Sequence, residues 1–357
     1  MYKKNQVALL DKQQKYKKFL QTSEVIPVLE ILSKTTQQRF LYGENGLSKL
    51  IPRLKFRIHT DARECFALWN KFNTDKSLFA LWDFRTAFHD AWDEKRYFLT
   101  IYNNSEPIGL LPLAYDEKEK VYEWYGTEWQ EENKFYQRGK NLFPLLFTVM
   151  PAQIKCNSII PSSIDEDYSQ EFIPDDPQFY IDITNLKNVN ELFSTFSKKH
   201  RYNFRRDYMH ILEQKPQVEW ITSPAGQVRS LFTIKDLSIK RFGEAEDKNS
   251  SMFRHEKYLE SFINIVKNQG KYKTKMLVVK IQGKIVAIDM IAMYDKGYYL
   301  LQGASDLGNY SGLGNFICYL EFEDAIKNGF EEINALQEDN NWKHRYFSSR
   351  PLLKLKK

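Results

Sequence analysis

Cysteine is scarce in this chain of 357 residues, and the three present, Cys65, Cys156 and Cys318, lie far apart. Their spacing matches no metal-binding motif, and a sparse, odd number suits a reducing cytosol better than a disulfide-linked secreted protein. The histidines are scattered too, and the sequence pairs none of them with metal ligands or with a serine or cysteine nucleophile. We therefore expect a cytoplasmic protein with no metal site and no covalently bound cofactor.

Long apolar runs are also missing. No run reaches the roughly 20 residues that a membrane-spanning helix needs, and the first residues lack the apolar core and cleavage site of a signal peptide. Hydrophobic residues nevertheless make up 42% of the chain, and aromatic residues 15%. The composition predicts a folded protein with a sizeable core and enough residues for two domains.

Positive charge is concentrated at the two ends of the chain, although the net charge is only +6. Residues 1–18 are rich in lysine, and the chain ends in "LKLKK". Such tails can contact RNA or the surface of an anionic membrane, but more often they only increase solubility. Both interpretations of the lysine-rich N-terminus stay open.

The hydrophobic pattern predicts helices and strands in the same order in both halves. In the second half, it predicts one long basic helix over 189–214, begun by Asn188 or Asn190. An antiparallel meander follows, with its strands at 273–281, 285–294 and 298–304. A helix after Gly314 and a parallel strand in "EEINALQ" complete this half.

This order predicts an α+β (α/β) fold with two tandem domains, each a mixed, mainly antiparallel sheet flanked by helices. We expect an N-terminal helical extension over residues 1–50. The first domain would cover residues 51–188, and the second would cover residues 189–357.

The stretch "NYSGLGNFICYL" at 309–320 places two glycines between the meander and the helix. A helix N-terminus carries unsatisfied N–H groups and partial positive charge, so a phosphate fits there. Gly312 and Gly314 would let a ligand approach the backbone closely. A dinucleotide fingerprint would need glycine at Ile317, and no Gly-Lys pair in the chain is followed by the serine or threonine of a P-loop. A plain turn into the helix remains the alternative.

A meander, a Gly-x-Gly turn, a helix and a strand, in this order, resemble the acyl-CoA site of the GNAT acyltransferases. The family motif is Gln or Arg, two residues, Gly, one residue, then Gly or Ala, and here Asn309 stands in the first position. The basic stretch "FSKKHRYNFRRD" after "PQFYIDIT", with Trp342-Lys343 near the end, resembles FemAB-like proteins with doubled GNAT domains, whose relatives include CelD-like bacterial acetyltransferases. The resemblance covers about residues 55–350.

The resemblance implies an acyltransferase that moves an acyl group from acyl-CoA to an amine or hydroxyl acceptor by direct attack. The second domain would hold the donor, and the first would shape the acceptor groove. The residues implied in acyl-CoA binding are Asn309, Ser311, Gly312, Leu313, Gly314 and Asn315.

Three basic residues of the predicted helix, Lys199, Arg201 and Arg205, are spaced so that several share one face. We expect them to bind phosphate groups of a substrate, with Trp342 and Lys343 as further substrate-binding residues. The alternative is a solvated helix whose charges have no ligand.

Three acidic residues are candidates for the proton acceptor that such a transfer needs. Asp289 interrupts the apolar strand "IVAIDMIAM", and a carboxylate inside a sheet must be paired or line a cleft. It is either catalytic or the structural partner of an arginine or tyrosine. Glu338 and Asp339 follow the last strand and are either a catalytic base or ordinary loop charges.

Two other functions stay open. The same fold can use an aminoacyl-tRNA as donor, which the basic helix and the unusual Asn309 favour. The chain can also be a non-catalytic binding module that docks through its lysine-rich N-terminus. Fold alone does not choose among these.

Overall fold

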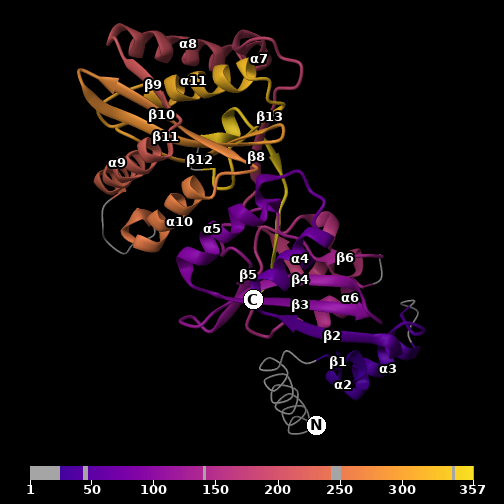
Figure 1. Cartoon of the computed structure of the whole chain (residues 1–357). Coiled ribbons are helices and arrows are strands. Elements are labelled where there is room, and N and C mark those ends of the chain that lie inside the picture. The colour runs from indigo at the N-terminus through magenta and orange to yellow at the C-terminus, as the bar shows by residue number, and fades with distance from the viewer. Residues whose placement is uncertain (1–24, 43–46, 140–141, 243–250, 340–341, 357) are drawn as a thin grey trace. The chain divides into compact units, whose positions relative to one another are not determined.

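A computed structural model describes residues 25–42, 47–139, 142–242, 251–339 and 342–356 (Figure 1). The chain divides into two compact units. Unit 1 comprises Met1–Asp75, Asp93–Asp175 and Leu353–Lys357, and unit 2 comprises Lys76–Trp92 and Asp176–Leu352. Residues 76–92 and 176–188 therefore belong to unit 2, although the sequence analysis placed them in the first domain. The lysine-rich residues 1–18 lie outside the described residues.

Unit 1 is built on a sheet in the order β1-β2-β3-β4-β5, with β6 paired to β4. Its strands are β1 (Ile26–Pro27), β2 (Leu54–His59), β3 (Lys95–Asn103), β4 (Glu106–Asp116), β5 (Val121–Trp124) and β6 (Tyr136–Gln137), with β7 (Phe172–Pro174) and β15 (Leu353–Leu355) forming a separate pair. Its helices are α2 (Val28–Ile31), α3 (Lys34–Tyr42), α4 (Ala62–Phe72) and α6 (Phe143–Thr148), with 3-10 turns η1 (Ile51–Arg53), η3 (Pro161–Ser163) and η4 (Glu166–Glu171).

The connection from β2 into α4 follows directly from the sequence. Leu54, Phe56 and Ile58 alternate along β2 and are buried in the core of unit 1. The Asp61 side chain then accepts hydrogen bonds from the backbone N–H groups of Arg63 and Glu64, at 2.9 and 3.0 Å, which starts α4. The short turn fixes the first residues of α4 next to the end of β2.

Unit 2 is built on a sheet in the order β14-β8-β13-β12-β11-β10-β9, in which β12 and β13 are parallel. Its strands are β8 (Gln178–Asp182), β9 (Gln217–Ile221), β10 (Lys273–Ile281), β11 (Lys284–Tyr294), β12 (Gly297–Ser305), β13 (Glu332–Asn334) and β14 (Ser348–Arg350). Its helices are α5 (Trp82–Trp92), α7 (Val189–Thr195), α8 (Lys198–Glu213), α9 (Pro224–Phe242), α10 (Glu256–Lys267) and α11 (Leu313–Lys327), with 3-10 turns η2 (Leu78–Ala80), η5 (Met252–Arg254) and η6 (Lys343–Arg345). In Figure 1, α7, α8 and α11 lie on one face of this sheet, and α9 and α10 lie on the other.

The predicted single helix over 189–214 is two helices. Asn188 caps α7, because its side chain accepts from the N–H of Glu191 at 3.1 Å. The chain then turns at Phe196, and Ser197 caps α8 by accepting from the N–H of His200. A serine inside an otherwise helical pattern starts a new helix here, because its hydroxyl satisfies a backbone donor.

The α+β prediction is confirmed, and the three meander strands of unit 2 lie where the alternation predicted them. Within the described ranges, no helix is both long and apolar enough to cross a membrane. The same residues contain no group of three or more histidine, cysteine or acidic side chains arranged to hold a metal ion. A cytoplasmic location stays a prediction.

Candidate functional site

The helix α11 begins at a glycine that the structure requires. Gly312 is the residue before α11 and has a left-handed backbone, with φ of +84°. A Cβ atom placed on it would lie 2.8 Å from Cβ of Asp207 and 3.1 Å from its Cα. Glycine therefore allows both the left-handed turn and the close approach of α8.

A carboxylate from α8 occupies the space beside this turn. Asn315 Nδ2 donates to Asp207 Oδ2 at 2.7 Å, and the Tyr346 hydroxyl donates to Asn315 Oδ1 at 3.2 Å. Arg206 donates to the other oxygen, Asp207 Oδ1, at 2.6 and 2.8 Å. A negative side chain of the protein thus lies close to the partly positive end of α11, where a bound phosphate would otherwise be favoured.

The other residues predicted to bind acyl-CoA have different surroundings. Asn309 Nδ2 donates to both carboxylate oxygens of Asp306, at 2.9 and 3.0 Å, so it fastens the loop before the turn. Leu313 is buried in the core, and Ser311 is exposed. Only Gly312 and Asn315 join the cluster around Asp207. Their role toward a donor stays a prediction.

Asp289 is paired with a second acidic residue rather than with an arginine or tyrosine. It lies half-buried on β11, on the face that α11 covers, and a hydrogen bond joins it to Glu321 of α11. Glu321 is 2% exposed, and its Oε1 has no hydrogen-bond partner among the described residues. Burial raises the pKa of Asp289 to about 7 and also raises the pKa of Glu321. The pair therefore retains a proton at neutral pH.

A glycine on the neighbouring strand gives Asp289 its space. Gly303 of β12 lies directly opposite Asp289 in the sheet. A Cβ atom on Gly303 would lie only 2.3 Å from Asp289 Oδ1, and Gly303 itself is exposed. The carboxyl group of Asp289 therefore lies next to an accessible part of the sheet.

The thiol of Cys318 lies beside this pair. Cys318 is buried one turn before Glu321 on α11. Burial, followed by the nearby carboxyl groups of Glu321 and Asp289, raises the pKa of the Cys318 thiol far above its usual range. A thiol that stays protonated forms no acyl-enzyme, so this arrangement suits direct transfer between two substrates.

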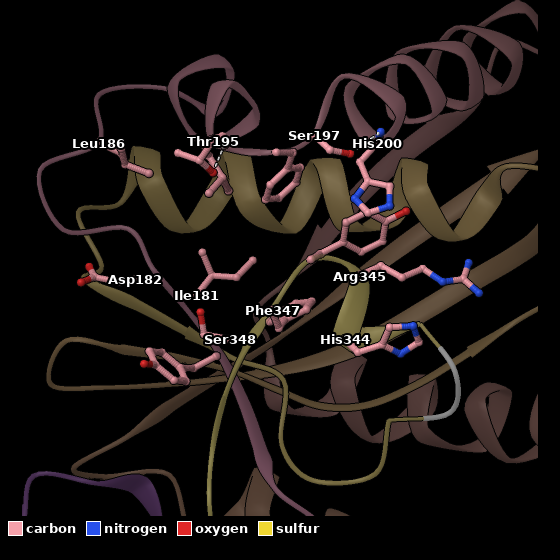
Figure 2. Close-up of a pocket in the computed structure, with 14 residues that line it drawn as sticks. Ile181, Asp182, Leu186, Thr195, Ser197, His200, His344, Arg345, Phe347 and Ser348 are labelled. Atoms are coloured by element: carbon pink, nitrogen blue, oxygen red, sulfur yellow. Dashed lines mark hydrogen bonds between the residues drawn. The ribbon is translucent and has the colours of Figure 1, made fainter.

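A pocket of about 410 Å³ opens beside α7 and the start of α8 (Figure 2). Its aromatic part contains Phe196 and Tyr346, whose ring centroids are 5.6 Å apart, and His200 contacts Tyr346 at 5.4 Å. His344 and Arg345 lie on the same side of the pocket as His200 in Figure 2. We call this the α7–α8 pocket. It combines aromatic surface with basic side chains and is connected through Tyr346 to Asn315.

The residues of the predicted basic face differ in their contacts. Lys199 and Arg205 are exposed on α8. Arg201 NH1 donates to the carbonyl oxygens of Ser194 and Phe196, at 3.0 and 3.1 Å, so it stabilises the turn between α7 and α8. Lys199 and Arg205 therefore remain the residues of this set that are open to a ligand.

Three predicted site residues near the C-terminus, Lys343, Trp342 and Asp339, make contacts within the loop that contains them. The buried Lys343 ammonium group donates to the carbonyl oxygen of Gln337, and Trp342 packs edge-on against Phe347 at 5.7 Å. Asp339 accepts from the backbone N–H of His344 at 3.0 Å and also contacts its ring. Lys343 and Asp339 therefore bind groups of their own loop rather than the Asp289–Glu321 pair.

Glu338 is exposed in the same loop, with a left-handed backbone at φ of +60°. Its charge acts on Tyr258 of α10, on the other face of the sheet from α11. Of the three acidic candidates, only Asp289 lies beneath α11. The catalytic roles of all three stay predictions.

Sequence reasoning missed Asp207, Tyr346 and Glu321. Glu321 was detectable, because it lies three residues after Cys318 and four before Ala325, on a stripe that is otherwise apolar. An acidic residue on the buried stripe of a helix needs a polar partner, and Asp289 is that partner. Asp207 and Tyr346 had no comparable signal.

The meander, the glycine turn, the long helix and the parallel strand of unit 2, preceded by a second meander in unit 1, define a doubled GNAT fold. Residues 198–344 match the family model described as "Acetyltransferase (GNAT) domain". The part of unit 2 that this model covers is therefore a GNAT-type acetyltransferase domain.

Three solved structures share this fold at low sequence identity. One is the C-terminal domain of a putative lysylphosphatidylglycerol synthetase from Agrobacterium fabrum, with 10% identity, a TM-score of 0.52, and coverage of 82% of this chain and 91% of that one. FemX has 12% identity, a TM-score of 0.52, and coverage of 83% and 96%. L-PGS from Bacillus licheniformis has 15% identity, a TM-score of 0.50, and coverage of 83% and 92%.

Each of these matches extends over more than four fifths of the chain, so it includes parts of both units. The predicted FemAB-like doubled GNAT fold is therefore confirmed. A comparison with curated proteins produced no match.

Proposed function

We propose that this enzyme transfers an acyl group from an activated donor to an amine or hydroxyl acceptor, with Asp289 as the proton acceptor. The observation that carries the proposal is the Asp289–Glu321 pair beneath α11, in the domain that matches the GNAT family. A general base works best when its pKa lies near the working pH, and the pKa of Asp289 is about 7.

The proposed step needs no covalent intermediate. The acceptor nitrogen or oxygen attacks the donor carbonyl carbon, and a bond forms between them. The bond from that carbon to the leaving sulfur or oxygen breaks, and the leaving group takes the electron pair. Asp289 accepts the proton that the acceptor loses, and Glu321 positions it through their hydrogen bond.

Acyl-CoA is the first candidate donor, because GNAT domains use it as a co-substrate. Its phosphates would lie near the N–H groups at the start of α11, next to Gly312 and Asn315. Arg206 is 58% exposed at the same place and can offset the charge of Asp207. Lys199 and Arg205 supply further positive charge on α8.

An aminoacyl-tRNA is the second candidate donor, and two observations favour it. The Asp207 carboxylate already complements the end of α11, which weakens binding of a diphosphate there. The α7–α8 pocket offers aromatic rings with basic neighbours, the combination that stacks on bases and contacts phosphates. In addition, one structural neighbour is named a putative lysylphosphatidylglycerol synthetase, a name that joins an amino acid to a lipid.

Binding measurements on the full chain separate the two donors. If acyl-CoA is the donor, acetyl-CoA raises the melting temperature, and Gly312→Glu abolishes that increase. If aminoacyl-tRNA is the donor, RNA copurifies, and its affinity falls steeply with salt because phosphate contacts release counterions. Absence of both effects, with no transfer activity, would support the binding-module alternative instead.

The predicted contact of residues 1–18 with anionic membranes is tested separately. Flotation with vesicles that contain anionic lipid should carry the full chain, and deletion of residues 1–18 should abolish this. Retained flotation after the deletion would exclude the lysine-rich N-terminus as the membrane contact.

A further inference from the structure

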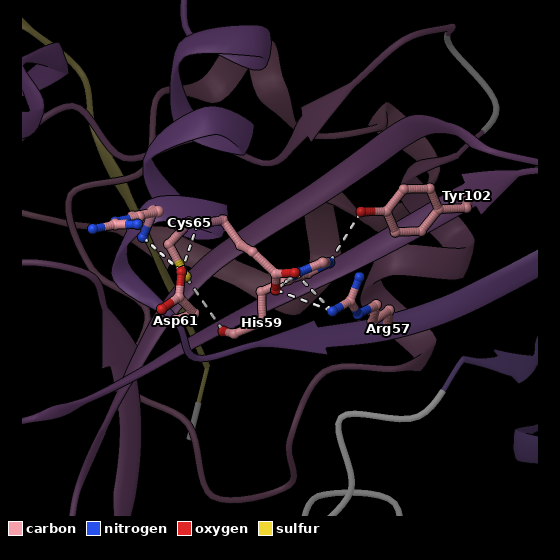
Figure 3. A network of polar contacts seen from close by, with 7 residues as sticks. Arg57, His59, Asp61, Cys65 and Tyr102 are labelled. Carbon is pink, nitrogen blue, oxygen red and sulfur yellow. Dashed lines mark hydrogen bonds and ion pairs between the residues drawn. The ribbon is translucent and has the colours of Figure 1, made fainter.

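Unit 1 contains a buried histidine with a partner on each ring nitrogen (Figure 3). His59 ends β2 and is only 3% exposed. Its Nδ1 lies 2.8 Å from Glu64 Oε2 of α4, and its Nε2 lies 3.0 Å from the Tyr102 hydroxyl of β3. Three separate elements therefore bring a carboxylate, an imidazole and a phenol into one hydrogen-bonded line.

The charges of the two partners determine the direction of these hydrogen bonds. The hydrogen bond to His59 lowers the pKa of Glu64, so Glu64 is an ionised acceptor. Burial lowers the pKa of His59, so the ring is neutral at pH 7. The proton is therefore on Nδ1, and Nε2 accepts a hydrogen bond from the Tyr102 hydroxyl. The phenol oxygen keeps its lone pairs for another donor.

This line ends in a pocket of about 240 Å³. One wall of the pocket is a stripe of α4 that contains Glu64, Leu68 and Lys71. The other wall contains Arg57 of β2 and Tyr102 of β3. The volume equals roughly eight water molecules at about 30 Å³ each, so the pocket suits a small ligand.

Two cationic side chains, Arg57 and Lys71, line this pocket, and each is paired with a carboxylate. One nitrogen of Arg57, NH2, binds both oxygens of Glu64, at 2.8 and 3.1 Å. This leaves the remaining N–H groups of the guanidinium for a planar anion. Lys71 is 38% exposed and pairs with Glu106 at 3.1 Å. With neutral His59, the lining carries two cations and one anion.

We propose that this pocket binds a small organic anion that also carries a hydroxyl or ammonium group. Arg57 and Lys71 attract the anionic group, and the Tyr102 oxygen accepts a hydrogen bond from the hydroxyl or ammonium group. The His59–Glu64 pair holds Tyr102 in the orientation that leaves its lone pairs toward the pocket. This binding site lies in unit 1 and does not depend on the proposed acyl transfer.

Isothermal titration calorimetry on the full chain tests the proposal with defined probes. L-lactate, L-serine and glycerol 3-phosphate carry both groups, whereas acetate and glycerol carry one each. We expect at least one of the first three to bind about tenfold more tightly than acetate and glycerol, which is about 1.4 kcal/mol. The comparison of lactate with glycerol 3-phosphate distinguishes a carboxylate from a phosphate.

Two variants assign the contacts. Tyr102→Phe should weaken binding of the preferred probe about fivefold, close to the affinity of acetate, and leave acetate binding unchanged. Arg57→Gln should weaken every anionic probe. Tyr115→Phe and Arg53→Gln are matched controls in unit 1 and should bind as the unchanged chain does. If Arg57→Gln fails to fold by circular dichroism, the exposed Lys71→Gln replaces it.

A purely structural histidine gives different results. In that case, no probe produces binding heat at about 10 mM, or Tyr102→Phe lowers the melting temperature while binding of the preferred probe is unchanged. The ¹⁵N resonances of His59 provide an independent measurement. A bound probe should shift the Nε2 signal, and a signal that no probe moves would overturn the proposal.

Discussion

The two halves of the chain, which form most of unit 1 and unit 2, follow the same order up to the end of their meanders and then differ. In unit 2 the meander leads into α11, which has 15 residues and begins at a left-handed glycine. In unit 1 the corresponding helix, α6, has only six residues and carries Pro144 in its first turn. Phe143 of α6 contacts the ring of Phe147 in the same helix and the rings of Tyr168 and Phe172 outside it.

The two units also differ in the surroundings of their acidic residues. Each unit has a pair of hydrogen-bonded acidic residues, Asp289–Glu321 in unit 2 and Glu94–Glu123 in unit 1. Only the pair in unit 2 lies under a long helix and beside an exposed glycine. The shared order of elements therefore supports the fold in both units, whereas the proposed transfer chemistry concerns unit 2.

The largest expected effect is the loss of activity on replacing Asp289. Asp289→Asn should lower kcat by about 10²–10³-fold, because it removes the proposed general base while keeping the shape of the side chain. The transfer rate with a saturating donor measures this. Glu123→Gln changes the acidic pair of unit 1 and should leave kcat within about twofold. Equal losses of kcat in both variants would contradict the proposal that only the acidic pair of unit 2 takes part in the transfer.

The same pair should make stability depend on pH. The pKa of Asp289 is raised in the folded protein, so the stabilising contribution of this residue is fully present below about pH 4 and is lost as pH rises through about 7. The unchanged chain should therefore lose more stability between pH 5 and pH 8 than Asp289→Asn does. Urea denaturation at the two pH values measures the difference. Parallel pH profiles would mean that the pair is ionised in the folded enzyme.

The glycines at the two turns should differ in a matched test. Gly312→Ala should destabilise by about 2–3 kcal/mol, because it combines a left-handed backbone with a clash against Asp207. Gly139 of unit 1 also has positive φ, at +104°, but none of the described residues has an atom within 4 Å of its Cβ position. Gly139→Ala should therefore cost only about 1 kcal/mol. If the two variants lose similar unfolding free energy in denaturant, α8 shifts to make room for a side chain at position 312.

The smallest expected effect concerns the charge beside α11. Asp207→Asn should reduce stability by about 0.3–1 kcal/mol, because it removes a negative charge from the helix N-terminus. The same change should tighten binding of acetyl-CoA if the CoA phosphates lie there. Calorimetry at low salt measures both, with Asp236→Asn of α9 as the control. Weaker acetyl-CoA binding would indicate that Asp207 holds the turn open for the donor.

The predictable part of this molecule is the part determined by local periodicity. Alternation predicted the meander strands. The residue type at the start of the predicted helix indicated Asn188 or Asn190 as its cap, and Asn188 is the cap of α7. The helix break at Ser197 was visible as a capping residue in "FSKKH" but was outweighed by the helical pattern around it.

Pairings between distant segments were less accessible. Asp289 was recognised as a buried carboxylate that needs a partner, but the partner expected was an arginine or tyrosine. His59 was treated as one of several scattered histidines, because Tyr102 lies 43 residues away and reaches it only through strand pairing. Spacing along a single sequence does not record such contacts.

The path of the chain has a practical meaning for anyone who wishes to study one unit alone. The polypeptide leaves unit 1 at residue 76, returns at 93, leaves again at 176 and returns at 353. The first segment outside unit 1 contains α5. Its Phe84 packs against Tyr272, and its Phe88 packs against Phe262, in the interior of unit 2. A protein expressed from residue 176 onward would lack these rings and expose an apolar face, so we expect it to aggregate. Neither unit is a contiguous stretch of the sequence, so a truncation at a single boundary isolates neither of them.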